Sequence, residues 1–436
     1  MNEPVTAPGS RVVWLKIAIL FAVAFSLSAV WVKTGIGFNP RRQPDAALFE
    51  GVAANLADGH GYSYDTKPPY RPELTRSPCF PALASLVYRL FGRDREAVFW
   101  MNAVFVSLAV VLGYVLARRL FRDERAAWIG ACVMCLTPQV SGSSDSFLSE
   151  PLAMFLIVLI ALVALRAGGW RDRPWEAAAL GGLGLLMAAL VLARANFTVP
   201  VLVATGWVSF SLLRGRWRSP RAWAALLAFS VTLGGPVLAW SARNASVGLS
   251  FAPMPAGGAA SYVYETKRFA DLILDPDEQV PMVNRVYWSH YRKHLGPKQI
   301  LEIERENRVW FKNVLRRHWN RILLATPWRV VNLFSNPLVC VYDQPWPNDL
   351  DEWVMPRLIW VSRVLWLLSF VGFLVAWRRK EARWVWLASV GILIPFHLLT
   401  VCHYRYSTSL LPLAMPYCGV AVTAFGRFLV RRFRRR

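Results

Sequence analysis

Acidic and basic side chains gather in one polar stretch, Gly35 to Ala97, which follows a long apolar segment. The stretch holds Asp45 near its start and ends in the run Arg71-Pro72-Glu73-Leu74-Thr75-Arg76-Ser77-Pro78-Cys79-Phe80-Pro81. A positioned carboxylate such as Asp45 can take a proton from an attacking hydroxyl group. The guanidinium groups of Arg71 and Arg76 can bind phosphate through paired hydrogen bonds. Unspecific contact with lipid headgroups is an equally weighted alternative for both arginines.

Two more acids lie near the start of an apolar segment at 148–165. Asp145 and Glu150 lie in the run around Ser146-Phe147-Leu148-Ser149 and Pro151. An ionisable group at the end of a membrane helix is costly to desolvate and is often functional. The helix dipole offers a structural explanation for Glu150, and helix capping offers one for Asp145. We expect either acid to act beside Asp45 in catalysis.

Positively charged residues also occur where two apolar segments would face the outside. Arg194 stands in Leu192-Ala193-Arg194-Ala195-Asn196, and Arg405 in Cys402-His403-Tyr404-Arg405-Tyr406-Ser407. An outward-facing arginine runs against the positive-inside tendency, so each needs an acid or a bound anion. His403 can serve as an acid or base, although a lone interfacial histidine is more often simply solvated. The candidate substrate-binding residues are Arg76, Arg71, Tyr62, Arg194, His403, Arg405 and Tyr406, and no metal ligand is assigned.

The composition indicates the kind of element that must position these groups. Of 436 residues, 55% are hydrophobic and 18% are charged, whereas soluble domains carry about 25% charged residues. Apolar runs of roughly 20 residues, enough to cross a bilayer, recur along the chain. The first, Val12 to Trp31, is too long for a signal-peptide core and lacks a small-residue cleavage site. The sequence therefore predicts an all-α polytopic membrane protein, with helices near 12–32, 98–117, 126–142, 148–165, 177–193, 197–213, 222–241, 356–377, 384–401 and 408–426.

The net charge of +23 is distributed unevenly over the predicted loops. With the N-terminus inside, the inner loops 118–125, 166–176, 214–221, 378–383 and 427–436 together carry +16. The two long outer loops, 34–96 and 242–355, carry only +1 and +2. Excess Lys and Arg in cytoplasmic loops is the rule for membrane proteins, so both termini are expected in the cytoplasm. The same rule accounts for the basic charge without a nucleic-acid partner.

Three regions follow from this topology. Residues 1–241 form an N-terminal transmembrane catalytic module that includes the outer loop 34–97, which we expect to be helical. Residues 242–355 form an outer loop domain of mixed structure, since a structureless loop of that length would be unusual. Within it, 301–334 has aromatic and arginine residues at helical spacing, which suits an interfacial helix or a helix packed in a soluble cap. Residues 356–436 supply the last membrane helices and a basic cytoplasmic tail.

Cysteine pairs and known sequence motifs limit the chemistry further. A disulfide between Cys79 and Cys340 would need an oxidising outer compartment, and the sequence leaves it open. Cys132 and Cys135 lie in an apolar segment without a second pair, so we expect them to pack in the core. The chain has no Walker A run, Gly-x-Ser-x-Gly elbow or HExxH motif, which argues against ATP-driven pumps and common hydrolases.

An ordered set of short motifs resembles the GT-C superfamily of membrane glycosyltransferases. The similarity is to family 39 and its relatives, the protein O-mannosyltransferases and the lipid A aminoarabinose transferases. It covers residues 12–195 well, the last helices moderately and 242–355 weakly. The motifs are Asp45 after the first helix, Ala53-Ala54-Asn55-Leu56-Ala57-Asp58-Gly59-His60-Gly61-Tyr62, Arg76 to Pro81, Tyr88-Arg89-Leu90-Phe91-Gly92, Asn102, Leu116 to Phe121, Pro138, Ser149-Glu150, and Arg405-Tyr406 before Leu411-Pro412.

The resemblance implies an activity and roles for several residues. Such enzymes move a sugar from a polyprenyl-phosphate carrier to a lipid, glycan or protein acceptor outside the cytoplasmic membrane. Asp45 matches the first-loop general base, Asp145 and Glu150 match the region of a second acid, and Arg76 matches a position that binds carrier phosphate. The first loop lacks an Asp-Glu or Asp-Asp pair, because Pro44 and Ala46 flank Asp45. The use of a divalent metal is therefore left open.

A base for the acceptor hydroxyl and a cation for the leaving phosphate would allow direct displacement with inversion, which needs no covalent enzyme intermediate. Two alternatives remain at this point. A lipid-linked saccharide transporter or flippase would share the helices and basic residues, but it does not require a long outer domain, and the internal repeats common in transporters are absent. A polysaccharide polymerase or O-antigen ligase usually has its main outer loop late and no early acidic loop. The sugar, the acceptor and the oligomeric state are not indicated by the sequence.

Overall fold

The computed structural model describes residues 10–34, 44–253, 263, 266, 269–278, 297–335, 348–391 and 405–433. Within these residues the regular secondary structure is helical, apart from one isolated antiparallel bridge between Ser63 and Pro72. Eight of the described helices are long and apolar enough to cross a membrane. They are α1 (Ser10–Thr34), α4 (Arg95–Phe121), α7 (Glu150–Ala167), α8 (Glu176–Ala193), α9 (Thr198–Leu213), α10 (Pro220–Ser246), α18 (Asn348–Ala376) and α22 (Leu411–Phe433).

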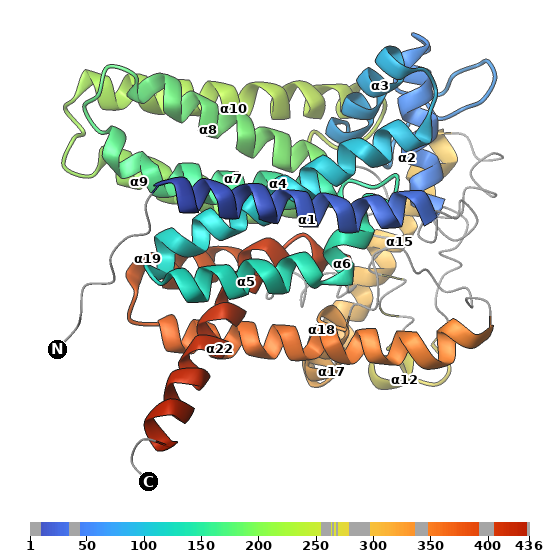
Figure 1. Ribbon diagram of the computed structural model, residues 1–436. Coiled ribbons are helices and arrows are strands. Elements are labelled where there is room, and N and C mark those ends of the chain that lie inside the picture. Colours follow the sequence, from blue (N-terminus) through green and yellow to red (C-terminus); the bar gives the residue numbers. More distant parts are fainter. Residues whose placement is uncertain are drawn as a thin grey trace.

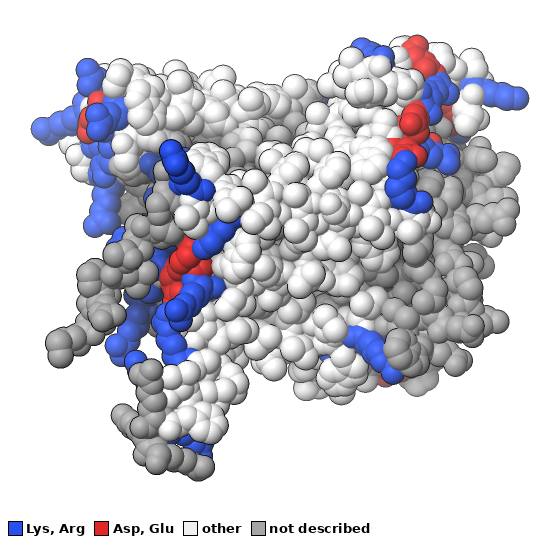
Figure 2. Space-filling view, viewed as in Figure 1, with Lys and Arg blue, Asp and Glu red and all other residues white. Residues whose placement is uncertain are grey.

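The long helices lie side by side in one bundle (Figure 1). In the face shown in Figure 2, most charged side chains lie toward the two ends of the bundle, and the surface between them is largely uncharged. An uncharged band flanked by charged ends is what a bilayer requires, since a charge in its core is costly. The fold class predicted from composition, an all-α polytopic membrane protein, is confirmed.

Two of the ten expected membrane helices differ from the sequence prediction. The segment predicted at 126–142 contains α5 (Glu124–Leu136), which ends before Thr137. Pro138 then opens the short α6 (Pro138–Ser141), because proline lacks an N–H group and disfavours helical geometry in the residue before it. The segment predicted at 384–401 begins as α19 (Lys380–Trp386) and continues as a π-helical turn over Leu387–Gly391. Residues 392–404 lie outside the described chain.

Close backbone contacts hold the late helices against the early ones. α22 packs against both α5 and α18. A Cβ atom at Gly419 would lie 1.9 Å from the carbonyl oxygen of Ala126, and one at Gly372 would lie 1.8 Å from that of Tyr417. Glycine is required at both positions because small residues let membrane helices approach this closely. The bundle therefore joins α5, α18 and α22 into one packed unit.

Shorter helices make up the described parts of the two long loops. The first outer loop, which was predicted to be helical, contains α2 (Pro44–Ala57) and α3 (Cys79–Phe91). The described part of 242–355 contains α12 (Ala270–Ile273), α15 (Pro297–Arg317), α16 (Trp319–Leu324) and α17 (Thr326–Leu333). The helix predicted over 301–334 is thus three helices, interrupted at His318 and Ala325. α2, α3 and α15 lie at the right-hand end in Figure 1, and the ends of α1 and α22 nearest the termini lie at the opposite end.

Candidate active site

Asp45 lies in the first turn of α2, and Arg76 holds its carboxylate. The Arg76 guanidinium donates a hydrogen bond from Nη2 to Oδ1 of Asp45. The same guanidinium lies 5.5 Å from the ring centre of Phe49 and donates from Nη1 to the carbonyl oxygen of Thr75 at 2.8 Å. Arg76 is 9% exposed, so water screens this ion pair only weakly. The candidate base and the candidate phosphate-binding cation are therefore in direct contact.

Arg71 has a different partner within the same loop. Its Nε donates to Oδ2 of Asp65 at 2.9 Å, and its Nη2 donates to Oδ1 at 2.7 Å. The backbone N–H of Arg71 donates to the same carboxylate at 2.8 Å. Asn55 supports the loop from α2 by donating to the carbonyl oxygens of Ser63 and Asp65. A bidentate Arg–carboxylate pair of this kind fixes geometry, so Arg71 braces the loop.

A turn that contains two glycines places Tyr62 against the backbone of Arg76. Gly59 and Gly61 have φ values of +82° and +83°, which side chains other than glycine rarely adopt. The Tyr62 hydroxyl donates to the carbonyl oxygen of Arg76 at 3.0 Å. Burial raises the pKa of Tyr62 well above its usual value, and the nearby carboxylate of Glu73 raises it further. Tyr62 therefore remains a neutral hydrogen-bond donor at physiological pH.

Two residues that were not singled out from the sequence lie near Tyr62. Glu73 is 3% exposed, and its carboxylate accepts from the backbone N–H and the hydroxyl of Thr75 at 2.7 and 2.6 Å. Arg243, near the end of α10, stacks over the rings of Tyr62 and Trp240 at 5.1 and 4.8 Å. The sequence could have indicated Arg243 as a candidate, because it is an arginine at the predicted outer end of a helix, like Arg194.

Glu150 and Arg194 form a second ion pair. Glu150 begins α7, and Arg194 is the C-cap residue that directly follows α8. Oε1 of Glu150 lies 2.8 Å from Nη1 of Arg194, and their side chains are 0% and 7% exposed. The acid that the outward-facing Arg194 was expected to need is therefore Glu150. Asp145 is fully buried in the segment that leads to Glu150, and Asn102 fixes that segment by donating to the carbonyl oxygen of Ser146 at 2.7 Å.

A row of phenylalanine rings connects the first loop with the segment that carries Asp145 and Glu150. The rings of Phe49 in α2 and Phe80 in α3 meet edge to face, with centroids 5.7 Å apart. Phe80 meets Phe147 in the same way, also at 5.7 Å. Edge-to-face pairs of buried rings fix orientation as well as burying apolar area. The two groups of acids thus lie at one end of the bundle, around a shared aromatic core.

The C-terminal candidates are only partly described. His403 lies outside the described residues, and so does Cys340, whose pairing with Cys79 the sequence left open. Arg405 and Tyr406 begin α21 (Arg405–Thr408), and the structure describes the backbone at these two positions but not the side chains. α21 packs near α17. Arg405, Tyr406 and His403 therefore remain predictions from the sequence.

Part of this chain is similar in sequence to known sugar transferases of membranes. Residues 75–240 match the family model described as dolichyl-phosphate-mannose-protein mannosyltransferase. An undecaprenyl phosphate-alpha-4-amino-4-deoxy-L-arabinose arabinosyl transferase of Pseudomonas paraeruginosa is 32% identical over 149 residues, which are 33% of this chain and 26% of that relative. Its counterpart in Pseudomonas aeruginosa is 31% identical over 156 residues, 35% and 27% of the two chains. The chain thus spans about a quarter of the length of these curated relatives.

Two solved structures are also similar over most of the chain. ArnT from Cupriavidus metallidurans bound to undecaprenyl phosphate aligns with a TM-score of 0.41 at 14% identity, covering 95% of this chain and 78% of that one. The oligosaccharyltransferase AglB from Archaeoglobus fulgidus aligns with a TM-score of 0.47 at 15% identity, covering 95% and 51%.

The chain is a multi-pass membrane protein, and its sequence match over residues 75–240 agrees with the resemblance to membrane glycosyltransferases that its motifs indicated. The family match includes Arg76, Asp145, Glu150 and Arg194, and it begins after Asp45.

Proposed function

We propose that this protein is a GT-C-type glycosyltransferase that moves a sugar from a polyprenyl-phosphate-linked donor to an acceptor at the outer face of the cytoplasmic membrane. The observation that carries the proposal is the contact between Asp45 and Arg76 at the end of an apolar helix bundle. The match of residues 75–240 to a family of sugar transferases supports it. In this arrangement both termini face the cytoplasm, as the charge of the loops predicts.

The chemistry assigns one role to each member of the pair. An acceptor hydroxyl attacks the anomeric carbon of the donor sugar, and its proton passes to the carboxylate of Asp45. The bond between the anomeric carbon and the phosphate oxygen breaks, and polyprenyl phosphate leaves with the electron pair. Direct displacement inverts the anomeric configuration. Arg76 stabilises the negative charge that develops on the leaving phosphate.

The ion pair between Asp45 and Arg76 implies that the donor binds before the acceptor is activated. When the donor binds, its phosphate becomes the partner of the Arg76 guanidinium, which binds phosphate bidentately. The carboxylate of Asp45 is then released to accept the proton of the acceptor. Binding of the donor therefore prepares the base, and acceptor activation follows donor binding.

Other residues have supporting roles in the proposal. Tyr62 positions Arg76 through its backbone carbonyl, and Arg243 adds positive charge beside Tyr62 and Glu73. The buried pair of Glu150 and Arg194 fixes the ends of α7 and α8, and Asp145 is the candidate second acid. The substrate-binding predictions for His403, Arg405 and Tyr406 complete the site, whereas Arg71 braces the first loop.

Transfer by the purified protein tests this function directly. Envelope lipids, glycans and proteins from cells with and without the gene are compared by mass spectrometry, and one missing sugar mass identifies the modification. The purified protein is then incubated in detergent with lipid and envelope extracts from the deletion cells. We expect the missing sugar to appear on its acceptor and polyprenyl phosphate to be released. A transporter forms no product in detergent, so restored export in vesicles without transfer in detergent would overturn the proposal.

A further inference from the structure

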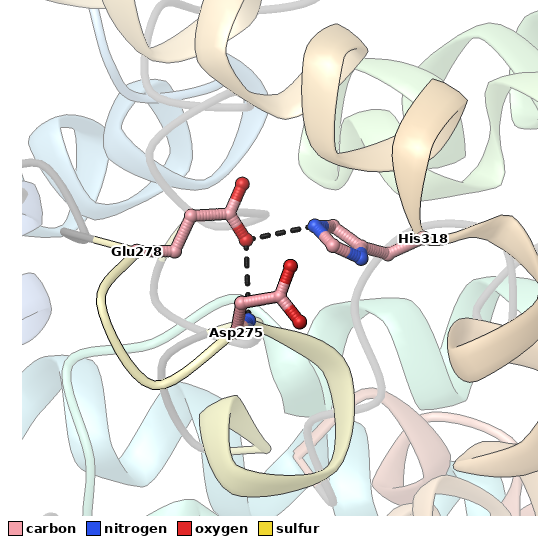
Figure 3. Close-up of side chains that lie close together, drawn as sticks. All are labelled: Asp275, Glu278 and His318. Carbon is pink, nitrogen blue, oxygen red and sulfur yellow. Dashed lines mark hydrogen bonds and ion pairs between the residues drawn. The ribbon is translucent and has the colours of Figure 1, made fainter.

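Three residues that can bind metals lie together in the segment 242–355, outside the site described above. Asp275 and Glu278 follow α12, and His318 lies between α15 and α16. One ligand atom from each residue lies within 4.8 Å of the other two. Figure 3 shows the imidazole ring and both carboxylates turned toward a common centre.

A tight turn brings the two carboxylates together. The backbone N–H of Glu278 donates to the carbonyl oxygen of Asp275 at 3.0 Å, which closes the turn Asp275-Pro276-Asp277-Glu278. Aspartate at the first position and proline at the second favour this geometry. The backbone N–H of Asp275 also lies 3.3 Å from Oε2 of Glu278 and orients that side chain toward its neighbour.

A small apolar cluster holds the turn against the helix junction that carries His318. Ile273 and Leu274 pack with Val314 of α15 and with Ala325, which follows α16. These four residues are between 1% and 7% exposed. The positions of both carboxylates relative to the imidazole are therefore fixed by packing on each side, and a ligand would find the cluster already assembled.

The environment of His318 points to a ligand. The residue is 6% exposed, and its Nε2 atom lies 2.7 Å from Oε2 of Glu278. This contact is an ion pair when the imidazole is protonated, but it is not aligned as a hydrogen bond, and no other hydrogen bond reaches Nε2 within the described part of the chain. A buried polar atom without such a bond is costly, and coordination to a metal removes that cost.

The donor set matches that of zinc. Zinc binds imidazole nitrogen and carboxylate oxygen at about 2.0–2.2 Å in tetrahedral sites, and three protein ligands leave a position for water. At these lengths the ligand atoms are roughly 3.4 Å apart. To bind the ion, the close pair of Nε2 and Oε2 must therefore move apart slightly, and more widely separated ligand atoms must move closer together.

Two arginines adjoin the cluster and offer an alternative, purely ionic arrangement. Nη1 of Arg321 lies 2.7 Å from Oδ1 of Asp275, and Nη1 of Arg317 lies 3.9 Å from Oε1 of Glu278. Their side chains are 41% and 73% exposed, so both can turn toward water. Each arginine is nearest one oxygen of its carboxylate, which leaves the other oxygen for a cation.

We propose that Asp275, Glu278 and His318 bind a divalent transition-metal ion, with zinc as the favoured ion. The ion joins the turn after α12 to the junction of α15 and α16. Because metal binding to a folded site contributes to folding free energy, zinc stabilises this part of the outer domain. The site is independent of the proposed sugar transfer.

Zinc content and thermal stability test this site without any assay of transfer. The full-length protein is purified in detergent through a tag that contains no histidine, stripped with EDTA, loaded with zinc and gel-filtered. Elemental mass spectrometry then counts zinc per chain, and the melting temperature is measured with and without zinc. We expect a single zinc ion per chain and a zinc-dependent rise in melting temperature.

Glu278→Gln and His318→Gln should lose both the bound zinc and the zinc-dependent rise. The control is His60→Gln, which removes an exposed imidazole from the first loop and should retain both. Melting temperatures in EDTA show whether each variant is folded, and Glu278→Gln decides the question if His318→Gln is unstable. A wild-type protein that retains no zinc, or a Glu278→Gln variant that retains as much as the wild type, would overturn the proposal and leave the ionic arrangement.

Discussion

Glu150 and Arg194 lie 2.8 Å apart with both side chains almost completely removed from water. Glu150 begins α7 and Arg194 caps the C-terminus of α8, so the pair connects the ends of two neighbouring membrane helices. Removing one partner from a buried ion pair leaves the other charge desolvated, which costs about 3–5 kcal/mol. Loss of either residue should therefore destabilise the helix bundle, and the pair is also a part of the candidate site.

Glu150→Ala should lower thermal stability in detergent, by roughly 3–5 kcal/mol where unfolding is reversible. The double variant Glu150→Leu with Arg194→Met should recover most of this loss, because it replaces both charges with apolar groups of similar size. We expect the double variant to be stable and defective in transfer. Equal thermal stability of wild type and Glu150→Ala would show that the Glu150–Arg194 pair does not stabilise the helix bundle.

Asp45→Asn should abolish measurable transfer, a loss of roughly 10²–10⁴-fold, because an amide cannot accept the proton of the acceptor. Binding of the polyprenyl phosphate should be largely retained. The matched control is Asp58→Asn, which removes an acid from the same loop that pairs with Arg93. Transfer by purified Asp45→Asn at the wild-type rate would exclude Asp45 as the base.

Arg76→Ala should weaken binding of the lipid donor by about 10–100-fold, since a hydrogen bond to a charged group contributes roughly 1.5–3 kcal/mol. Arg76→Lys keeps the charge but loses the planar fork, so its KM for the donor should lie between those of wild type and Arg76→Ala. Arg71→Lys is the control, because Arg71 binds Asp65 and should affect loop stability instead. An unchanged donor KM in Arg76→Ala would remove this residue from the phosphate site.

Tyr62 should make the protein less stable at alkaline pH. Burial, followed by the carboxylate of Glu73, raises the pKa of Tyr62 in the folded state above the unfolded value of about 10. The stabilisation is fully present below that unfolded pKa and is lost as the pH rises through the folded pKa. Melting temperatures measured from pH 8 to pH 11 should therefore fall less steeply for Tyr62→Phe than for wild type. Tyr70→Phe, a change of the same size in the same loop, is the control, and identical slopes for wild type and Tyr62→Phe would contradict the prediction.

Cys79 should react slowly with alkylating reagents at neutral pH. Burial raises the pKa of its thiol to about 11, so roughly 0.1% is thiolate at pH 8. Its alkylation rate, followed by mass spectrometry of the peptide, should rise about tenfold per pH unit between pH 8 and pH 10, because the thiolate is the reactive form. A rate that levels off below pH 9 would show a lower pKa.

The membrane fold could be predicted from the sequence because apolar length and loop charge are local properties. The helix breaks were harder to place. The apolar pattern around 126–142 continues past Thr137, although Pro138 ends α5 there. Likewise, the aromatic and arginine residues of 301–334 keep a helical spacing across His318, where the helix stops. Apolar periodicity records which face is buried and is insensitive to a single interruption of the backbone.

The members of the candidate site could be proposed from the sequence, but their pairing could not. Asp45 and Arg76 are 31 positions apart, and nothing in the sequence indicated that Arg71 would bind Asp65. Glu73 and Arg243 were not singled out, because an acid beside an arginine and an arginine at a helix end are common at surfaces. Their burial depends on how α10 packs against the first loop, which is a tertiary property.

The glycine contacts of α22 have a consequence for biosynthesis. Gly419 meets the backbone of Ala126 in α5, yet almost 300 residues are made between the two. Throughout that interval the face of α5 that receives α22 has no partner from its own chain, and lipid or an insertion factor must cover it. Replacing Gly419 with a larger residue would therefore be expected to trap the chain after insertion, with its early helices formed and its final helix unable to dock.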